Sequence, residues 1–313
     1  MLANSLIKIV RAFATLLVCV TIVFVVLRLS GDPATVMLPD DTPQDVIDEY
    51  RRLWGLDRTL VEQYVSYLVA IPNGDLGISF TENRPAAQVV FERIPATLQL
   101  GLAALALALS LGVPLGILAA IWRGSAMDRF VMGFAVLGFS IPNFFLAILL
   151  IVLFALHARW LPSAGSDSLA HMILPVITLA SATMGKLARF TRTSTLEVLG
   201  QPFVRTAYSK GLGRSYVIYR HVLPNAAIPI VTFLGFELGT VIAGAVVTES
   251  VFAWPGLGRL LVTSVAQRDL PVVQTIILLV SATLVASNLL VDLLYGWLDP
   301  RVKSFSPQGS DRK

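Results

Sequence analysis

Six apolar runs, each about as long as a bilayer is thick, constrain this chain more than any other feature. A helix of about 20 residues crosses the hydrocarbon core, where every backbone amide must be satisfied within its own segment. The composition agrees, with 55% hydrophobic residues, 14% charged residues and a mean hydropathy of +0.74. We therefore expect an all-α membrane protein, one domain over residues 1–313, with six transmembrane helices. The runs cover residues 9–29, 97–121, 130–156, 170–188, 226–247 and 272–295.

Lysine and arginine placement predicts the orientation. With the N-terminus inside, the inner segments hold fifteen of these residues and the outer segments eight. Most of the outer eight lie in one long loop, and long loops cross the membrane largely regardless of charge. Both termini are therefore expected in the cytoplasm.

The long outer loop, residues 30–95, carries eleven acidic and five basic residues. Its stretch TPQDVIDEYRRLWGLD has apolar residues at helical spacing. We interpret this loop as a soluble, amphipathic insertion within the membrane domain.

No pattern of catalytic or metal-ligating residues stands out. The chain has no GxxxxGK[ST] loop and no HExxH, and its three histidines, His157, His171 and His221, are far apart. The overall charge of +4 sums an acidic outside and a basic inside, so it does not indicate nucleic acid. We expect no enzyme activity, bound cofactor or bound metal in this chain.

The most informative segment is the cytoplasmic loop at residues 189–225. It is basic and aromatic, and its stretch RTAYSKGLGRSYVIYRHVLPN predicts two short helices joined by a glycine turn, the second ending before Pro224. Such a pair could lie on an anionic membrane surface or dock into a groove of a partner protein. The residues alone leave both possibilities open.

The spacing of this segment resembles the EAA loop of permease subunits of binding-protein-dependent ABC importers. There, a Glu-Ala-Ala triplet precedes a glycine and then an Ile-x-Leu-Pro element. Positions that match here are Ala207, Gly211, Leu223 and Pro224, whereas Arg205, Thr206 and His221 depart from the general pattern.

Those departures resemble the dipeptide, oligopeptide and nickel permease branch. Further stretches are similar to that branch over nearly the whole chain. They are GDP, RRLWGLD and GDLGISF, then SIPNFF with WLPSAG, then TESVFAWPGLGRLLVTSVAQRDLPVVQ, and finally NLLVDLLYGWLDPRVK.

The resemblance implies a type I importer-like permease in a bacterial inner membrane, with residues 30–95 periplasmic and residues 189–225 coupling to an ATPase. The partners it implies are two ATPase subunits, which would bind ATP and Mg, a second homologous permease, a periplasmic or lipid-anchored substrate-binding protein, and membrane lipid. The coupling residues expected are Arg205, Thr206, Ala207, Gly211, Tyr216, His221, Leu223 and Pro224. Gly211 would set the angle between the two helices, and Pro224 would redirect the chain into the fifth span.

Four polar residues are candidates for the substrate pathway: Ser140 and Asn143 at an expected break beside Pro142, Glu249, and Asn288. Polar groups within spans also make helix–helix hydrogen bonds. The substrate stays open among peptides, nickel complexes and glutathione-like molecules.

Two other classes of protein compete with this interpretation. An ion-coupled secondary transporter would be expected to pair acids with basic residues at mid-membrane, and no such pairs are evident. A channel or membrane scaffold is not supported either, because the sequence contains no filter-like motif. The ATP-driven permease is favoured.

Overall fold

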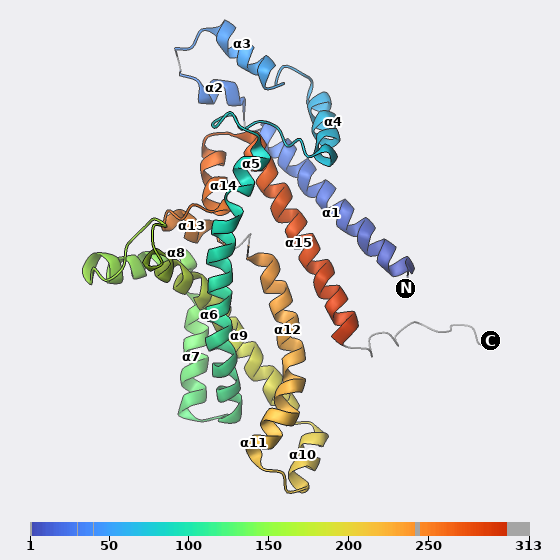
Figure 1. Ribbon diagram of the computed structural model, residues 1–313, viewed down its shortest axis with the longest axis vertical. Helices are drawn as coiled ribbons and strands as arrows, with labels where there is room; N and C mark the ends of the chain where they lie inside the picture. The colour runs from blue at the N-terminus through green and yellow to red at the C-terminus, as the bar shows by residue number, and fades with distance from the viewer. Residues whose placement is uncertain (1, 30, 40, 242–244, 299–313) are drawn as a thin grey trace, which may run out of the picture. The chain divides into compact units, whose positions relative to one another are not determined.

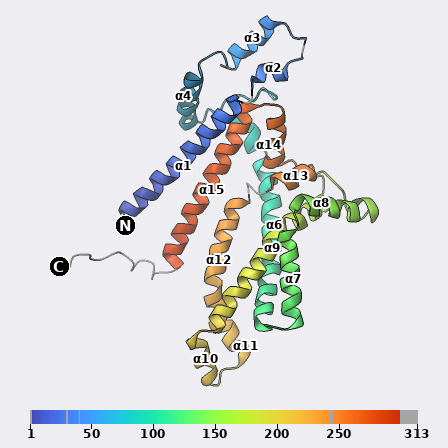
Figure 2. The same ribbon diagram turned by 180° about the vertical axis from the view of Figure 1, so that it is seen from behind.

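The computed structural model describes residues 2–29, 31–39, 41–241 and 245–298, which form helices and no β-strand (Figures 1 and 2). Four helices are long and apolar enough to cross a membrane, and two bent pairs bring the number to six if each pair is one span. The all-α expectation is confirmed. The four helical stretches are Val10–Leu29, Ala86–Ile121, Ala170–Leu199 and Leu270–Leu290.

The long helices are longer than several of the expected spans. The principal ones are α1 (Leu2–Leu29), α6 (Ile94–Ile121), α9 (Ala170–Leu199) and α15 (Leu270–Leu298). The fourth span was expected to end at residue 188, whereas α9 continues to Leu199. The basic residues of 301–313, which contributed to the predicted orientation, lie outside the described residues.

The third expected span is broken. Helices α7 (Ala126–Ser140) and α8 (Asn143–Leu150), with the π-helical turn Ile151–His157 that continues α8, meet at an angle of 102°. Ile141 is extended, as a residue before proline prefers, and this conformation ends α7. The break predicted beside Pro142 is confirmed. The expected span over residues 130–156 therefore consists of two helical segments.

The fifth expected span, residues 226–247, contains α12 (Leu223–Thr240) and the beginning of α13 (Val246–Val251). Residues 242–244 between these helices lie outside the described residues. The long outer loop carries four short helices. They are α2 (Pro33–Met37), α3 (Gln44–Leu53), α4 (Leu60–Ala70) and α5 (Ala86–Phe91). Of these, α3 lies in the stretch that was expected to be helical.

The chain forms two compact units. Unit 1 comprises Met1–Gly101, Leu150–Pro175 and Ile242–Val285. Its hydrophobic core joins α5, α14 (Leu257–Ala266) and the first turns of α15. Buried members of this core include Val89, Val90, Leu257, Val272 and Ile276.

Unit 2 comprises Leu102–Leu149, Val176–Val241 and Ala286–Lys313. Here small residues bring helices into close contact, as is common where apolar area alone gives little driving force. A Cβ on Gly185 of α9 would lie 2.4 Å from the carbonyl oxygen of Ala135 on α7. The glycine therefore permits the close approach of these two helices.

Candidate functional site

The segment expected to couple to an ATPase is a helix pair in unit 2. Helix α10 (Pro202–Ser209) begins with proline at its first position, and α11 (Arg214–Val217) follows after a short turn. Gly211 lies in this turn with φ of +81°, a conformation that favours glycine. The predicted helix–glycine turn–helix arrangement is confirmed.

The second helix does not end before Pro224, so that expectation was wrong. From α11 the chain continues through a π-helical turn, Ile218–Val222, directly into α12. The N–H of Leu223 donates to the carbonyl of Ile218, five residues back, and this wider turn accommodates a proline that lacks an N–H. The 43° bend lies at Pro229 rather than Pro224.

The helix pair has its own apolar core. The core consists of Val204, Ala207, Val217 and Val222, all buried, and Val198, Leu199 and Leu212 pack against it. Of the eight predicted coupling residues, Ala207 belongs to this core, and His221 and Leu223 are half-buried. The exposed members are Arg205, Thr206, Gly211, Tyr216 and Pro224.

Two contacts orient α11. The ring of Tyr216 meets that of His221 edge-on, with centroids 5.9 Å apart. Nη2 of Arg214 donates to the carbonyl oxygen of Ile121, 3.0 Å away at the C-terminal end of α6. Because the last carbonyls of a helix lack partners within it, this arginine satisfies one of them and ties α11 to the end of α6.

A partly buried ion pair in unit 2 was not predicted from the sequence. Nε and Nη2 of Arg192 donate to the two carboxylate oxygens of Asp128 at 2.7 and 2.8 Å. The N–H of Gly124 also donates to that carboxylate, and the hydroxyl of Ser125 caps α7. The 64-residue separation explains the omission, because Arg192 was counted only as one of many basic residues.

The pathway candidates are divided between the two compact units. Exposed Ser140 and half-buried Asn143 flank the break between α7 and α8, and Asn288 is exposed on α15. Glu249 on α13 has no exposed surface and belongs to a polar cluster in unit 1.

That cluster caps helix α14. Oε2 of Glu249 accepts from the backbone N–H groups of Gly258 and Arg259 at 2.7 and 3.2 Å. Its Oε1 accepts from the hydroxyl of Thr97 at 2.7 Å, and that hydroxyl accepts from the N–H of Leu257 at 2.8 Å. Burial raises the pKa of Glu249, an effect that the donated hydrogen bonds oppose.

The close packing in this cluster explains the two glycines of the PGLG stretch, residues 255–258. A Cβ on Gly256 would lie 2.3 Å from the carboxylate of Glu249, and one on Gly258 would lie 2.4 Å from the Cα of Val246. Only glycine lets α14 begin so close to α13. Trp254 closes the same region by donating from Nε1 to the carbonyl of Ala96.

A second buried carboxylate in unit 1 joins two distant motifs. Asp269 has no exposed surface, and it accepts from the hydroxyls of Ser79 and Thr81 and from the backbone N–H of Phe80. The stretches GDLGISF and VAQRDLP are therefore in direct contact, although they are nearly 190 residues apart. Both motifs are evident in the sequence, whereas their contact is not.

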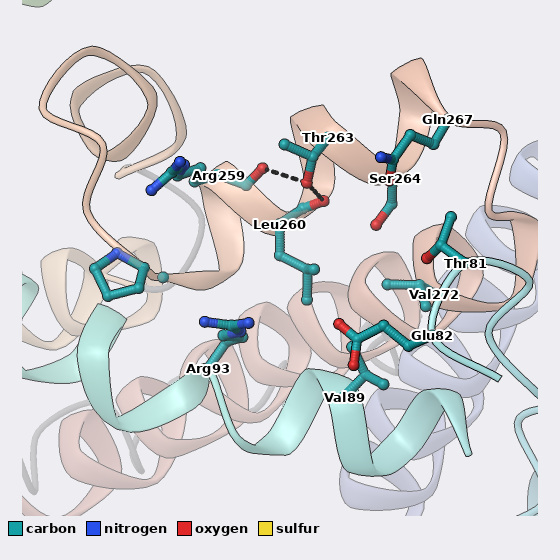
Figure 3. Close-up of a pocket in the computed structure, with 12 residues that line it drawn as sticks. Thr81, Glu82, Val89, Arg93, Arg259, Leu260, Thr263, Ser264, Gln267 and Val272 are labelled. Atoms are coloured by element: carbon teal, nitrogen blue, oxygen red, sulfur yellow. Dashed lines mark hydrogen bonds between the residues drawn. The ribbon is translucent and has the colours of Figure 1, made fainter. Parts of the chain in front are cut away.

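A polar cavity of about 420 Å³ opens between α5 and α14 in unit 1 (Figure 3). Arg93 and Arg259 lie on one side of it and Glu82 on the other. Arg259 also donates to the carbonyl of Ala253 at 2.6 Å. Arg93 and Arg259 thus line the cavity within segments expected to face outward, and the Arg259 guanidinium is turned toward Ala253.

Two family models match the chain. Residues 112–304 match the family described as "Binding-protein-dependent transport system inner membrane component", and residues 1–101 match the N-terminal part of such components. The first match covers more than half of the chain, so the protein belongs to this family. It is a multi-pass inner-membrane permease subunit of a binding-protein-dependent importer.

Individual relatives agree with this assignment. The chain is 42% identical over 290 residues to "Glutathione transport system permease protein GsiC" from Escherichia coli O6:H1, covering 92% of this chain and 95% of that protein. The same-named protein of Escherichia coli K12 is 41% identical and that of Pectobacterium atrosepticum 42%, with the same coverage. A solved structure of the MetNI methionine ABC transporter, inward facing, supports the fold, with a TM-score of 0.51 and 20% identity over 66% of this chain and 96% of that one.

Proposed function

We propose that this permease forms half of the translocation pathway of an ATP-driven importer for peptides or a related small solute. The names of its glutathione-permease relatives support a peptide-like substrate. In the proposed assembly a second, homologous permease completes the pathway, two ATPase subunits bind ATP and Mg, and a binding protein delivers the substrate. Residues 30–95 face the periplasm, and both termini lie in the cytoplasm.

The observation that carries the proposal is the helix pair α10–α11. Its core consists of small aliphatic residues, whereas Tyr216 and Tyr219 remain 54% and 73% exposed. Exposed aromatic side chains beside basic residues favour docking against a protein. We infer that this face enters a groove of an ATPase subunit and transmits its movement to α9 and α12.

Replacing Tyr216 with alanine tests the docking. Because the side chain is exposed, the variant should fold and reach the membrane, but co-purification of the ATPase and uptake should both fall. Trp160→Ala is the matched control, since Trp160 is 75% exposed and lies outside the helix pair. Normal ATPase association in Tyr216→Ala would contradict a contact at this position.

Gly211→Pro is a stronger test of the same segment. Proline cannot adopt φ of +81°, so the turn should change direction and ATPase association should be lost while the protein remains in the membrane. Gly213→Pro is the control, because Gly213 has φ of −65° and lies at the N-cap of α11. Intact association and transport in Gly211→Pro would overturn the coupling assignment.

Ser140, Asn143, Glu249 and Asn288 remain proposed pathway residues. The break between α7 and α8 supports Ser140 and Asn143, because irregular backbone at membrane depth is tolerated where it is buried or lines a cavity. Glu249 needs a conformation in which its capping hydrogen bonds open, since its carboxylate is fully buried here.

Two measurements separate the proposal from its alternatives. Uptake that persists with a proton uncoupler while ATP is held constant supports the ATP-driven importer, whereas collapse of uptake supports an ion-coupled carrier. Calorimetry on the partner binding protein with glutathione, dipeptides and oligopeptides then identifies the substrate class.

A further inference from the structure

Helices α1 and α4 enclose an apolar groove in unit 1. They meet where the hydroxyls of Thr21 and Tyr64 lie 2.5 Å apart and where the rings of Phe24 and Tyr64 have centroids separated by 5.2 Å. Figures 1 and 2 show the two helices side by side. The groove has a volume of about 230 Å³, and its apolar wall comes from Phe24, Val25, Leu29, Leu60 and Val61.

The outer face of α4 is also apolar. Val61, Val65 and Val69 recur every four residues and are 71%, 52% and 62% exposed. On α1, Ile22 and Val26 are 56% and 57% exposed. A stripe of this kind on a short helix is typical of helices that lie in the membrane interface. This stripe favours contact between α4 and lipid at the C-terminal end of α1.

Arg28 lines the groove, and one nitrogen of its guanidinium lacks a hydrogen-bond acceptor among the described residues. Nε of Arg28 is buried and has no hydrogen-bond partner among the described residues, and the guanidinium carbon lies 5.3 Å from the centroid of the Phe24 ring. Asp32 is the closest acidic residue in the sequence, but its carboxylate is used elsewhere. It accepts from Nε of Arg51 at 2.6 Å and from the N–H of Ala34 at 3.0 Å.

The same arginine lines a second, larger cavity of about 850 Å³. Arg28, Arg52 and Arg58 contribute to its lining, whereas Asp75 is the one acidic residue there. This concentration of positive charge contrasts with the outer loop as a whole, where acidic residues outnumber basic ones. Gln274 lines this cavity as well, and its buried Nε2 has no hydrogen-bond partner among the described residues.

We propose that the groove and the cavity together bind one anionic glycerophospholipid. Phe24 and Arg28 line both spaces, so a single molecule could place an acyl chain between α1 and α4 and its phosphate against Arg28. A phosphate supplies the charge-assisted acceptor that Nε of Arg28 lacks among the described residues. The lipid belongs to the leaflet at the C-terminal end of α1, which is the outer leaflet in the predicted orientation.

The apolar groove favours a lipid over a free phosphate or an acidic peptide. An ion alone leaves the apolar walls of the groove unfilled, whereas an acyl chain covers Val25 and Val61 and extends the lipid contact of α1. The anionic headgroup matches the three arginines, so phosphatidylglycerol should be preferred over phosphatidylcholine with the same acyl chains.

Native mass spectrometry of the purified full-length permease tests the site. After exchange into detergent containing equal amounts of phosphatidylglycerol and phosphatidylcholine, the wild-type protein should retain one phosphatidylglycerol. Arg28→Gln should reduce this preference about tenfold, as expected for losing one charge-assisted contact. Val25→Trp, which fills the groove but keeps the charge, should reduce retention of both lipids.

Arg159→Gln is the matched control, since Arg159 is exposed, lies after the π-helical turn that ends at His157, and lines neither space. It should retain lipid as the wild type does. Unchanged retention in both Arg28→Gln and Val25→Trp would overturn the proposal. Displacement of the lipid by millimolar inorganic phosphate would also overturn it, as would an acidic peptide retained in its place.

Discussion

Two regions of this permease bury carboxylates and satisfy them differently. In unit 1, Glu249 and Asp269 have no exposed surface and accept hydrogen bonds from hydroxyl and backbone N–H groups. In unit 2, Asp128 is 5% exposed and forms a two-pronged ion pair with Arg192. The first arrangement uses neutral donors, and the second uses an opposite charge.

The difference shows what each carboxylate holds together. Backbone donors are fixed in direction, so Glu249 defines how α13 meets the beginning of α14. A guanidinium is carried on a long side chain, so Arg192 can join α9 to α7 with more tolerance. We therefore expect the unit 1 cluster to be more sensitive to small changes.

The largest effect is expected for Glu249→Ala. The substitution leaves the buried N–H groups of Gly258 and Arg259 and the hydroxyl of Thr97 without their acceptor, which should lower the free energy of unfolding by about 3–5 kcal/mol. Thermal unfolding of the purified protein in detergent measures this loss. Glu49→Gln, on an exposed residue of α3, is the control and should change stability by less than about 0.5 kcal/mol. A similar melting temperature for both variants would show that the cluster carries little stability.

Breaking the ion pair in unit 2 should have the next largest effect. Arg192→Gln removes the hydrogen-bonded counter-ion of Asp128 and leaves the Gly124 hydrogen bond, at a cost of about 2–4 kcal/mol. The double variant Asp128→Asn/Arg192→Gln should recover most of this loss, because two neutral side chains can still form hydrogen bonds. A double variant as unstable as the single one would mean that charge pairing is not what stabilises this contact.

The close approach of α13 and α14 provides a third test of the difference between the two units. Gly258→Ala places a methyl group 2.4 Å from the Cα of Val246, so α14 must move away from α13 at a cost of about 1–3 kcal/mol. Gly133 in α7 has no neighbour within 4 Å of an added Cβ, and Gly133→Ala should be neutral or slightly stabilising. Equal melting temperatures for these two alanine variants would contradict the tight packing of α13 and α14.

A smaller effect is expected in the helix pair of unit 2. Gly211→Ala imposes φ of +81° on a residue with a side chain, which costs roughly 1–2 kcal/mol. Gly213 has φ of −65° and open space around it, so Gly213→Ala should cost less than about 1 kcal/mol. Limited proteolysis between α10 and α11 compares the two variants, and faster cleavage is expected for Gly211→Ala. Equal rates would indicate a turn that tolerates either conformation.

The smallest effect is a pH dependence of the unit 1 cluster. Burial raises the pKa of Glu249 in the folded protein, so its contribution is fully present at pH values below the ordinary carboxyl pKa and is lost as the pH rises through the raised value. Glu249→Gln should remove this part of the pH dependence of the melting temperature. An unchanged profile would assign the dependence to other groups.

Much of the fold followed from local sequence patterns. Hydropathy located six apolar runs, Pro142 predicted the break after α7, and Gly211 predicted the turn between α10 and α11. The interpretation failed at Pro224, because the wider helical turn before it depends on how Val217 and Val222 pack into the core of the helix pair. Proline predicts where a hydrogen bond is missing but not how neighbouring backbone adapts.

Local sequence was enough to predict which segments are helical and apolar and where the chain turns, because hydropathy and glycine or proline chemistry act over a few residues. Which residues share a site depends on how the helices pack. Thr97 meets Glu249 across 152 positions, and Ser79 meets Asp269 across 190. Such contacts depend on the register of packed helices and on the directions of single donors, which no local pattern specifies. The same holds for Arg28. Its Nε has no hydrogen-bond partner among the described residues, and the carboxylate of Asp32 accepts a hydrogen bond from Arg51 instead.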